Sequence, residues 1–517
     1  MKGANAIRAA LLSGLLTVAG PALANAPAAL PPSTQSQVQS ALAAAPKGIR
    51  FGLLVVDDAG EVIAAINHDQ RFIPASNTKL FTTAAAYALL PGMDQPDTVG
   101  GTQVAIVPMR DAERFSRKGS GILPGIGPRD KVPTGPVDVW LSGRGDARMS
   151  SAADCRVDCL AVLADAVAAK TRRVRDVVGD DSFWPDQRWT PGMSWNNIGT
   201  NDGTADGALN LDDNELPVVV TPGAAGQPPA IAASSYFQLQ NEALTGPAGS
   251  PNTLAIVRPV NGLGLRVYGS IPADAKPWSE RVGLDDPAHF AAWTFKAMLA
   301  ARGVKVTGTV RVNHRGRQIY DQPHDPGPLG TPISVGYNPL AQLTPAPLAA
   351  DVVTINKVSQ NLHAQVLFRR IGDRRGTGSE AWSAAALNDQ LTKAGIPREG
   401  YDFSDGSGMS TYNRVSPRAA VALLRWVDAQ PWGKAWYASL PIAGVDGTLK
   451  RRFVGTLLAG NLIAKTGTLN GTNALSGTFR AASGKRLTFA FFANDVPDGQ
   501  SAVPAMEAAL LGIAASN

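Results

Sequence analysis

A serine and a lysine three positions apart offer the clearest chemistry in this sequence. Ser76 and Lys79 lie within residues 74–81, where an apolar, alanine-rich helical pattern begins. If Ser76 opens that helix, Lys79 lies one turn on and on the same face, so its amine can take the serine's proton. Backbone N–H groups at the helix N-terminus would also approach the reacting carbonyl. The spacing therefore predicts a nucleophilic serine; the alternative is an ordinary N-cap serine and a solvated lysine.

A Ser-x-Asn triplet, Ser359-Gln360-Asn361, lies far along the chain among residues with helical patterning. The same spacing occurs at 194–196 and 250–252. Ser359 is preferred because it follows the long middle region and sits among helical elements. The alternative interpretation is an N-cap serine or a serine in a surface loop.

A Lys-Thr-Gly motif occurs once, as Lys465-Thr466-Gly467 followed by Thr468, on an apparent strand. Glycine on a strand leaves one face open, so a ligand can approach the backbone there. The alternative is an ordinary turn or edge strand. A Ser-x-x-Lys at a helix start, a Ser-x-Asn among helices and a Lys-Thr-Gly on a late strand form an ordered set known from penicillin-binding enzymes.

The elements that must position these motifs are separated by a long middle region. A predicted hairpin, 51–56 and 62–66, precedes the Ser76 helix. Helical patterns return at 347–371, 383–394 and 417–428. Strand-like runs follow at 462–468, 474–480 and 487–493, and a last helix is expected at 503–514. We expect one split domain from 27–90 and 333–517. Residues 91–332, with one helical pattern at 152–170, are expected to form an insertion of one or two mainly β subdomains.

The first residues have the order of a secretory signal, predicted for residues 1–24. Lys2 and Arg8 precede the apolar run 9–19. Ala22-Leu23-Ala24 then fits a small-x-small cleavage site, with cleavage expected near Ala24 or Ala26. The run is too short to span a bilayer comfortably. Export is therefore expected, a retained anchor being the alternative, and no later segment reads as a membrane span.

Composition favours an exported globular protein without a metal. The chain has 517 residues, 44% of them hydrophobic, which predicts two or three domains. Its net charge of +6 is modest, and its basic clusters lack interleaved aromatics, so nucleic-acid binding is not expected. Cys155 and Cys159 are spaced for a local disulfide in an oxidising compartment. The five histidines are dispersed, so zinc is not expected.

The ordered motifs resemble those of the penicillin-interacting acyl-serine transferases. The long insertion is similar to that of the D-alanyl-D-alanine carboxypeptidase/endopeptidase family, peptidase family S13 of the penicillin-binding protein 4 type. Segments 405–408, 444–449 and 208–214 also match the family, and the resemblance is strongest from Ser334 onward. It implies an α+β, multi-domain fold whose split β-lactamase/transpeptidase-like domain has an antiparallel sheet flanked by helices. It also implies a periplasmic enzyme.

The resemblance implies a role for each motif residue. Ser76 would attack the penultimate D-alanine of a peptidoglycan stem peptide, and Lys79, its pKa lowered by burial beside Lys465, would accept the proton. Ser359 would relay a proton to the leaving amine, while Asn361 would hold Lys79 and the substrate. Lys465 and Thr466 would contact the terminal carboxylate, and Gly467 would leave the strand open to the substrate. The N–H groups of Ser76 and Thr468 would bind the oxyanion. β-Lactams would acylate the same serine, no cofactor is implied, and a homo-oligomer is left open.

Two features depart from the family pattern. Gln360 stands where relatives commonly have aspartate, a change that leaves the flanking residues intact. Thr411 stands where an arginine usually reads the stem-peptide side chain. Asp180 matches an insertion aspartate that contacts the side-chain amine in relatives, its alternative being a turn-capping aspartate. Stem-peptide specificity is thus open.

Two rival functions fit the same motifs. A β-lactamase of this fold would turn over nitrocefin continuously, whereas a carboxypeptidase would give a stoichiometric burst. A non-catalytic wall-binding scaffold would not be labelled by penicillin. The sequence does not decide between carboxypeptidase and cross-link endopeptidase activity.

Overall fold

The computed structural model describes residues 32–517 except 110, 112–121, 124, 133, 324–335 and 375–376. The predicted signal peptide and both candidate cleavage positions lie outside these residues. Within the described part, no helix combines the length and apolarity needed to cross a membrane.

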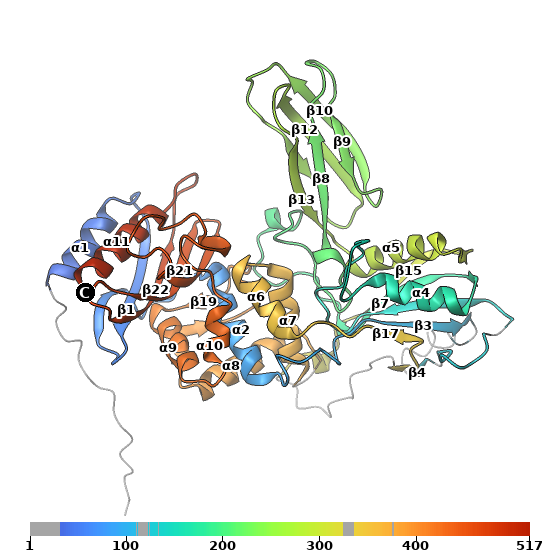
Figure 1. Cartoon of the computed structure of the whole chain (residues 1–517), viewed down its shortest axis with the longest axis horizontal. Helices are drawn as coiled ribbons and strands as arrows, with labels where there is room; N and C mark the ends of the chain where they lie inside the picture. The colour runs from blue at the N-terminus through green and yellow to red at the C-terminus, as the bar shows by residue number, and fades with distance from the viewer. Residues whose placement is uncertain are drawn as a thin grey trace, which may run out of the picture.

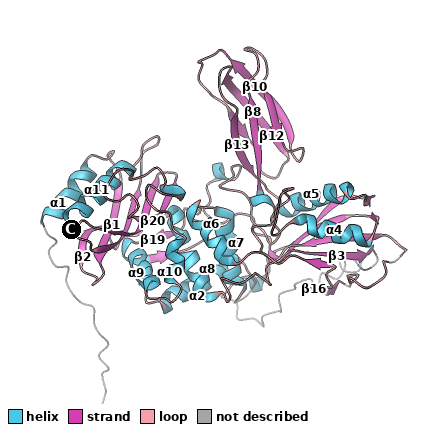
Figure 2. Cartoon of the chain, viewed as in Figure 1, coloured by secondary structure: helices cyan, strands magenta, loops and turns pink. Residues whose placement is uncertain are grey.

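A five-stranded antiparallel sheet, counted over the described residues, joins the two ends of the chain (Figures 1 and 2). Its order is β2-β1-β22-β21-β20, with bounds β1 Arg50–Asp57, β2 Val62–Ile66, β20 Ile463–Leu469, β21 Thr472–Arg480 and β22 Arg486–Asn494. The predicted hairpin and the three late strands are thus confirmed. β1 pairs with β22 from Arg50 opposite Asn494 to Asp57 opposite Leu487. This pairing makes one domain from segments more than four hundred residues apart.

Helices cover both faces of this sheet. Alternate residues of β1 face opposite sides, so Leu53 and Val55 pack in the core under α1 (Pro32–Ala43) and α11 (Val503–Ser516). Leu54 and Val56 pack in the core shared with α2 (Thr78–Leu89) and the other helices. Those are α6 Leu348–Lys357, α7 Asn361–Asp373, α8 Glu380–Lys393, α9 Pro417–Asp428 and α10 Gly433–Ala438. Burial of both faces explains why β1 is almost continuously apolar.

The helical pattern over 347–371 is interrupted between α6 and α7. Ser359 has a φ of 66°, a left-handed conformation that residues other than glycine adopt infrequently. Gln360 then caps α7, because its side-chain oxygen accepts a hydrogen bond from the N–H of Leu362 at 2.8 Å. The break places Ser359 at the junction of two helices.

The middle of the chain contains a second, mixed sheet in the described residues. Its order is β15-β7-β5-β3-β17, with bounds β3 Gln103–Pro108, β5 Val137–Ser142, β7 Val177–Pro185, β15 Val310–Arg315 and β17 Ala341–Gln342. α4 (Leu160–Lys170) and α5 (Pro287–Ala301) pack in the same hydrophobic core. Short pairs join β14 (Lys305–Val306) to β6 (Arg173–Val174) and β16 (Gly336–Tyr337) to β4 (Ile122–Leu123). The strands of this sheet alternate with helices, so this part is not purely β.

A β module stands away from the rest of the molecule (Figure 1). Two three-stranded sheets, as described, have the orders β13-β8-β9 and β10-β12-β11. The bounds are β8 Glu215–Thr221, β9 Ala230–Ala233, β10 Gln238–Gly246, β11 Ala255–Val257, β12 Gly264–Pro272 and β13 Trp278–Gly283. The mixed α+β, multi-domain architecture is confirmed, whereas the predicted domain boundaries remain a prediction.

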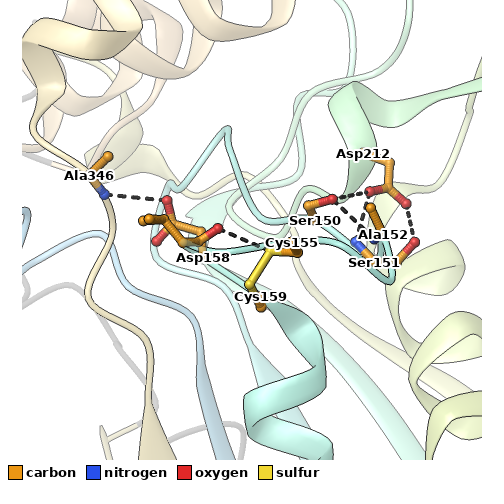
Figure 3. Close-up of a disulfide and its surroundings, with 9 residues drawn as sticks. Ser150, Ser151, Ala152, Cys155, Asp158, Cys159, Asp212 and Ala346 are labelled. Atoms are coloured by element: carbon orange, nitrogen blue, oxygen red, sulfur yellow. Dashed lines mark hydrogen bonds between the residues drawn. A yellow bond between two sulfur atoms is a disulfide. The ribbon is translucent and has the colours of Figure 1, made fainter.

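Cys155 and Cys159 form the expected disulfide (Figure 3). The helix predicted over 152–170 begins only at Leu160, because residues 153–158 form turns closed by this bridge. Asp158, at a φ of 58°, accepts a hydrogen bond from the N–H of Ala346 at 3.3 Å. The bridge therefore lies in a loop that contacts the segment leading into α6.

Candidate active site

Ser76 lies in a short 3-10 turn, Ala75–Asn77, that leads into α2. Ala75 has a φ of 47°, and a Cβ at Gly408 would overlap the carbonyl group of Ala75. Asn77 ties the turn to β20, because its side-chain amide donates to the carbonyl of Lys465 at 3.0 Å. The serine is thus held on a constrained backbone, as at many functional sites.

The amine of Lys79 lies against three oxygen atoms. Lys79 is fully buried, and its Nζ is 2.9 Å from Ser76 Oγ, 2.6 Å from Asn361 Oδ1 and 2.6 Å from the carbonyl oxygen of Ser407. The amide and carbonyl oxygens can only accept hydrogen bonds. A neutral amine would donate its two N–H bonds to them, which leaves its lone pair for the hydroxyl proton of Ser76.

Burial lowers the pKa of Lys79 to about 7, against the opposing charges of Asp405 and Asp202. Burial, followed by the charge of Lys79, holds the pKa of Lys465 well below its usual range. The sequence predicts that burial beside Lys465 lowers the pKa of Lys79, and burial is the largest cause in the structure. Removal from water is the main cause, and it makes a lysine able to accept a proton near neutral pH.

A second amine–hydroxyl pair comes from the other two motifs. Lys465 is fully buried on β20, and its Nζ is 2.9 Å from Ser359 Oγ and 3.0 Å from the carbonyl oxygen of Thr466. The hydroxyl of Thr466 donates to that of Thr448 at 2.7 Å. Gly467 lines the pocket, and a Cβ there would also lie 2.8 Å from the carbonyl oxygen of Pro74. Because glycine has no side chain, the segment before Ser76 can pack directly against β20 at this position.

Asn361 connects Lys79 to a loop of the insertion. While its Oδ1 faces Lys79, its Nδ2 lies 3.0 Å from the carbonyl oxygen of Asp202 and 3.3 Å from its carboxylate. Gln360 also contacts the insertion, since its Nε2 is 3.1 Å from Glu215 Oε1. The second motif therefore joins the insertion to the buried amine.

An open pocket of about 590 Å³ brings the predicted residues together. Its lining includes Ser76, Ser359, Asn361, Thr466, Gly467 and Thr468. The amines of Lys79 and Lys465 lie just behind the two serines. Eight of the nine residues singled out as catalytic or binding therefore line this pocket or lie directly behind it.

Asp180 is not part of this pocket. It lies in β7, 1% exposed, where its carboxylate accepts hydrogen bonds from Ser142 Oγ at 3.1 Å, Ser182 N at 3.2 Å and Asn313 Nδ2 at 2.7 Å. Because this carboxylate bonds to residues of β5 and β15, it helps to hold the second sheet together. Thr411 is also engaged, because its hydroxyl donates to the carbonyl of Gly192 at 2.9 Å.

Several residues in or behind the pocket did not emerge as site residues from the sequence. Asp202 has no motif around it, and Ser407 contributes only a carbonyl, which every residue type carries. Thr448 and Ser407 do lie in the glycine-containing segments 444–449 and 405–408, which gave a usable signal. Arg452, another lining residue, pairs with Glu507 at 2.5 Å.

Comparison with known proteins points to one family. Residues 128–517 match the model of the D-Ala-D-Ala carboxypeptidase 3 (S13) family. The D-alanyl-D-alanine carboxypeptidase of Actinomadura sp. (strain R39) is 34% identical over 503 residues, 94% of this chain and 85% of that protein. D-Alanyl-D-alanine carboxypeptidase DacB of Haemophilus influenzae is 24% identical over 94% of both chains.

The fold and the buried serine–lysine pair define a serine peptidase of the penicillin-binding type. The chain belongs to the D-Ala-D-Ala carboxypeptidase 3 (S13) family. The crystal structure of penicillin binding protein 4 (dacB) from Haemophilus influenzae has the same fold, with a TM-score of 0.73 at 22% identity over 91% of this chain and 97% of that one. That protein has also been solved with a β-lactam.

Proposed function

We propose that this chain hydrolyses the terminal D-alanyl-D-alanine bond of peptidoglycan stem peptides through an acyl-enzyme on Ser76. Family membership supports the reaction class. The observation that carries the proposal is the hydroxyl of Ser76 at 2.9 Å from a buried lysine amine whose other two neighbours are acceptors only. The order Lys2, Arg8, apolar run and small-x-small site supports action in the periplasm.

In the first half-reaction, Lys79 takes the proton of Ser76 as its oxygen attacks the penultimate D-alanine carbonyl. Backbone N–H groups of Ser76 and Thr468 stabilise the oxyanion. As the C–N bond breaks, the proton held by Lys79 returns to the leaving amine through the hydroxyl of Ser359. The released product is D-alanine, and the acyl group stays on Ser76.

Lys465, together with the hydroxyls of Thr466 and Thr448, meets the terminal carboxylate of the substrate. A carboxylate bound there favours the protonated form of Lys465 and so opposes the burial that lowers the pKa of this amine. Water then attacks the acyl-enzyme and gives its proton to Lys79. As the ester bond to Ser76 breaks, Lys79 returns that proton to the serine oxygen and the shortened peptide leaves. A β-lactam acylates Ser76 in the same way and leaves slowly.

Penicillin labelling tests the nucleophile. Intact wild-type protein should gain one fluorescent penicillin, and Ser76→Ala should reduce the labelling rate by roughly a thousandfold or more. Ser359→Ala should slow acylation, whereas Ser250→Ala, which alters another Ser-x-Asn triplet in the β module, should not. Labelling of Ser76→Ala at the wild-type rate would refute the assignment.

Mass spectrometry tests the substrate. Incubation with pentapeptide and with cross-linked muropeptides should release one D-alanine or cleave the D-alanyl cross-link. Unchanged substrate under conditions where penicillin still labels the protein would contradict the hydrolase proposal. Sustained nitrocefin turnover in place of a stoichiometric burst would indicate a β-lactamase instead.

A further inference from the structure

A second, larger cavity adjoins the active-site pocket. It measures about 830 Å³ and lies between a loop of the insertion, 195–202, and strands β11 and β13 of the β module. Asp202 lines both cavities. A molecule bound at Ser76 is therefore next to the occupant of the second cavity.

Two tryptophans line this cavity. Trp195 is 73% exposed, although burying an indole is among the most favourable contributions to folding. Trp278, at the start of β13, is partly buried and faces the same cavity. Flat apolar rings held open to solvent beside a substrate pocket suit a ligand with flat apolar faces of its own.

The cavity wall is organised before any ligand arrives. The carbonyl of Ile198 accepts a hydrogen bond from Arg258 Nη2 at 2.9 Å, and Thr200 forms a bridge with Val282. The indole N–H of Trp189 donates to the carbonyl of Gly203 at 3.0 Å. Because these contacts hold the loop from three sides, little ordering free energy would be lost on binding.

Acidic side chains outnumber basic ones in and behind this wall once the partners of its arginines are counted. Two acidic side chains, Asp202 and Glu280, face two arginines, and both arginines already have partners: Arg258 pairs with Asp285 at 2.5 Å and Arg281 with Glu215 at 2.6 Å. The side-chain amides of Asn196, Asn201 and Asn261 supply further donors and acceptors. Such a wall matches an uncharged ligand rich in hydroxyl and amide groups, rather than a polyanion.

We propose that this cavity binds the N-acetylated saccharide chain of the polymer whose stem peptides are hydrolysed at Ser76. Sugar rings offer C–H faces to Trp195 and Trp278 and hydroxyl and acetamido groups to the asparagines. The subsite rests on the proposed function, because only a peptide attached to glycan would place a saccharide beside the serine. The edge strands β11 and β13 could instead pair with an extended peptide, and the experiment separates these two ligands.

Binding of peptide-free glycan strands, prepared by amidase digestion, tests the proposal directly. The Ser76→Ala protein, which cannot turn over substrate, is titrated with these strands and with the free stem peptide, and binding is followed by calorimetry. Glycan strands should bind, and adding Trp195→Ala should weaken them by roughly fivefold or more. Tyr268→Ala, which removes an exposed aromatic of the same module outside the cavity, should leave glycan affinity and peptide hydrolysis unchanged.

Turnover gives a second readout. In the protein with Ser76 intact, Trp195→Ala should lower the ratio of D-alanine release from glycan-linked peptide to release from free peptide, chiefly through KM. Absence of glycan binding, or glycan binding unaffected by Trp195→Ala, would overturn the proposal. Binding of the free peptide that depends on Trp195 would also overturn it, in favour of a peptide site. Failure of the proposed function would appear separately, as absence of penicillin labelling at Ser76.

Discussion

At the scale of single residues, the state of Lys79 decides whether the site can react. Its three neighbours can all accept hydrogen bonds, so the protonated amine is well held and must lose a proton to act as a base. The pKa of about 7 places that loss near neutral pH. The activity of the enzyme should consequently be sensitive to pH in the neutral range.

The first prediction concerns this pH dependence. Penicillin acylation, measured as the second-order rate constant, should fall about tenfold for each pH unit below 7, because only the neutral amine accepts the proton. Asp202→Asn removes a carboxylate that raises the pKa of Lys79, so the acidic limb should move to lower pH. Asp274→Asn, at an exposed position in the β module, is the control. An acidic limb that stays in place in Asp202→Asn would show that this charge does not act on Lys79.

The residues of the site differ in how far the sequence revealed them. Ser76 and Lys79 are one helical turn apart, so spacing alone predicted their contact. Asp202 reaches Asn361 through a loop of the insertion, and no local pattern marks such a contact. Ser407 contacts Lys79 through its backbone carbonyl, and because every residue type has this group, the sequence could not identify the contact. Asp180 matched a family position, yet its strand neighbours occupy its carboxylate.

At the scale of elements, helices α6 and α7 connect the site to the insertion. His363, on α7, lies between Asp351 of α6 at 2.8 Å and Asp213 of the insertion at 2.9 Å. Burial disfavours the charged ring, but hydrogen bonds and charge from the two aspartates outweigh it and raise the pKa of His363 to about 9. A charged imidazole on α7 therefore joins this helix to α6 and to the insertion.

The second prediction is that His363→Gln lowers the free energy of unfolding by roughly 2 to 3 kcal/mol at neutral pH. The pKa in the folded protein lies above the ordinary value of 6.5, so this stabilisation is complete below pH 6.5 and is lost as pH rises through about 9. Urea denaturation of the wild type and of His363→Gln at pH 6 and pH 9.5 would measure the size of this stabilisation and its loss at high pH. His68→Gln serves as control, and an equal effect of His363→Gln at both pH values would contradict the assigned charge.

The third prediction concerns the Cys155–Cys159 loop. Cys155→Ser/Cys159→Ser opens a short loop, so the chain-entropy model predicts a loss of about 2 kcal/mol. Thermal unfolding of the double variant should also become insensitive to reductant. Penicillin labelling should persist, since the loop does not line the site pocket. A wild-type melting temperature unchanged by reduction would show that the bridge contributes nothing.

Element prediction from the sequence succeeded where patterns were local. The helices α2 and α9 follow helical apolar patterns, and the hairpin and the closing strands follow short apolar runs. α5 was missed, although Asp286 caps it by accepting from the N–H of His289 and Pro287 follows at the first position, a usual start signal. The late start of α4 could not be read from periodicity, because a covalent bridge overrides it.

At the scale of the whole molecule, a buried arginine connects the part of the chain that contains Ser76 and α7 to the insertion. Arg369 on α7 is 1% exposed and donates to Asp206 at 2.8 Å and to the carbonyls of Pro185 at 2.7 Å and Gly378 at 2.9 Å. It also lies over the ring of Trp184. Two parts of the molecule therefore share one buried charge.

The fourth prediction is that Arg369→Met destabilises this contact by roughly 3 to 5 kcal/mol, because it leaves Asp206 buried without its partner. Urea denaturation should show an earlier transition, and limited proteolysis should cut more readily between the insertion and α7. Arg480→Met, at an exposed strand end, should unfold as the wild type does. A variant at Arg369 with wild-type stability would mean that the arginine is not needed to hold the two parts together.

The pairing of β1 with β22 also bears on how the protein is made. Synthesis begins at the N-terminus, so Ser76 and its helix emerge long before the strands that complete their sheet. In the nascent polypeptide β1 can pair with β2, but its other edge has no partner until residues 487–494 have been added. A message truncated before the codons for these residues should therefore yield a protein that penicillin cannot label, even though the nucleophile has been translated.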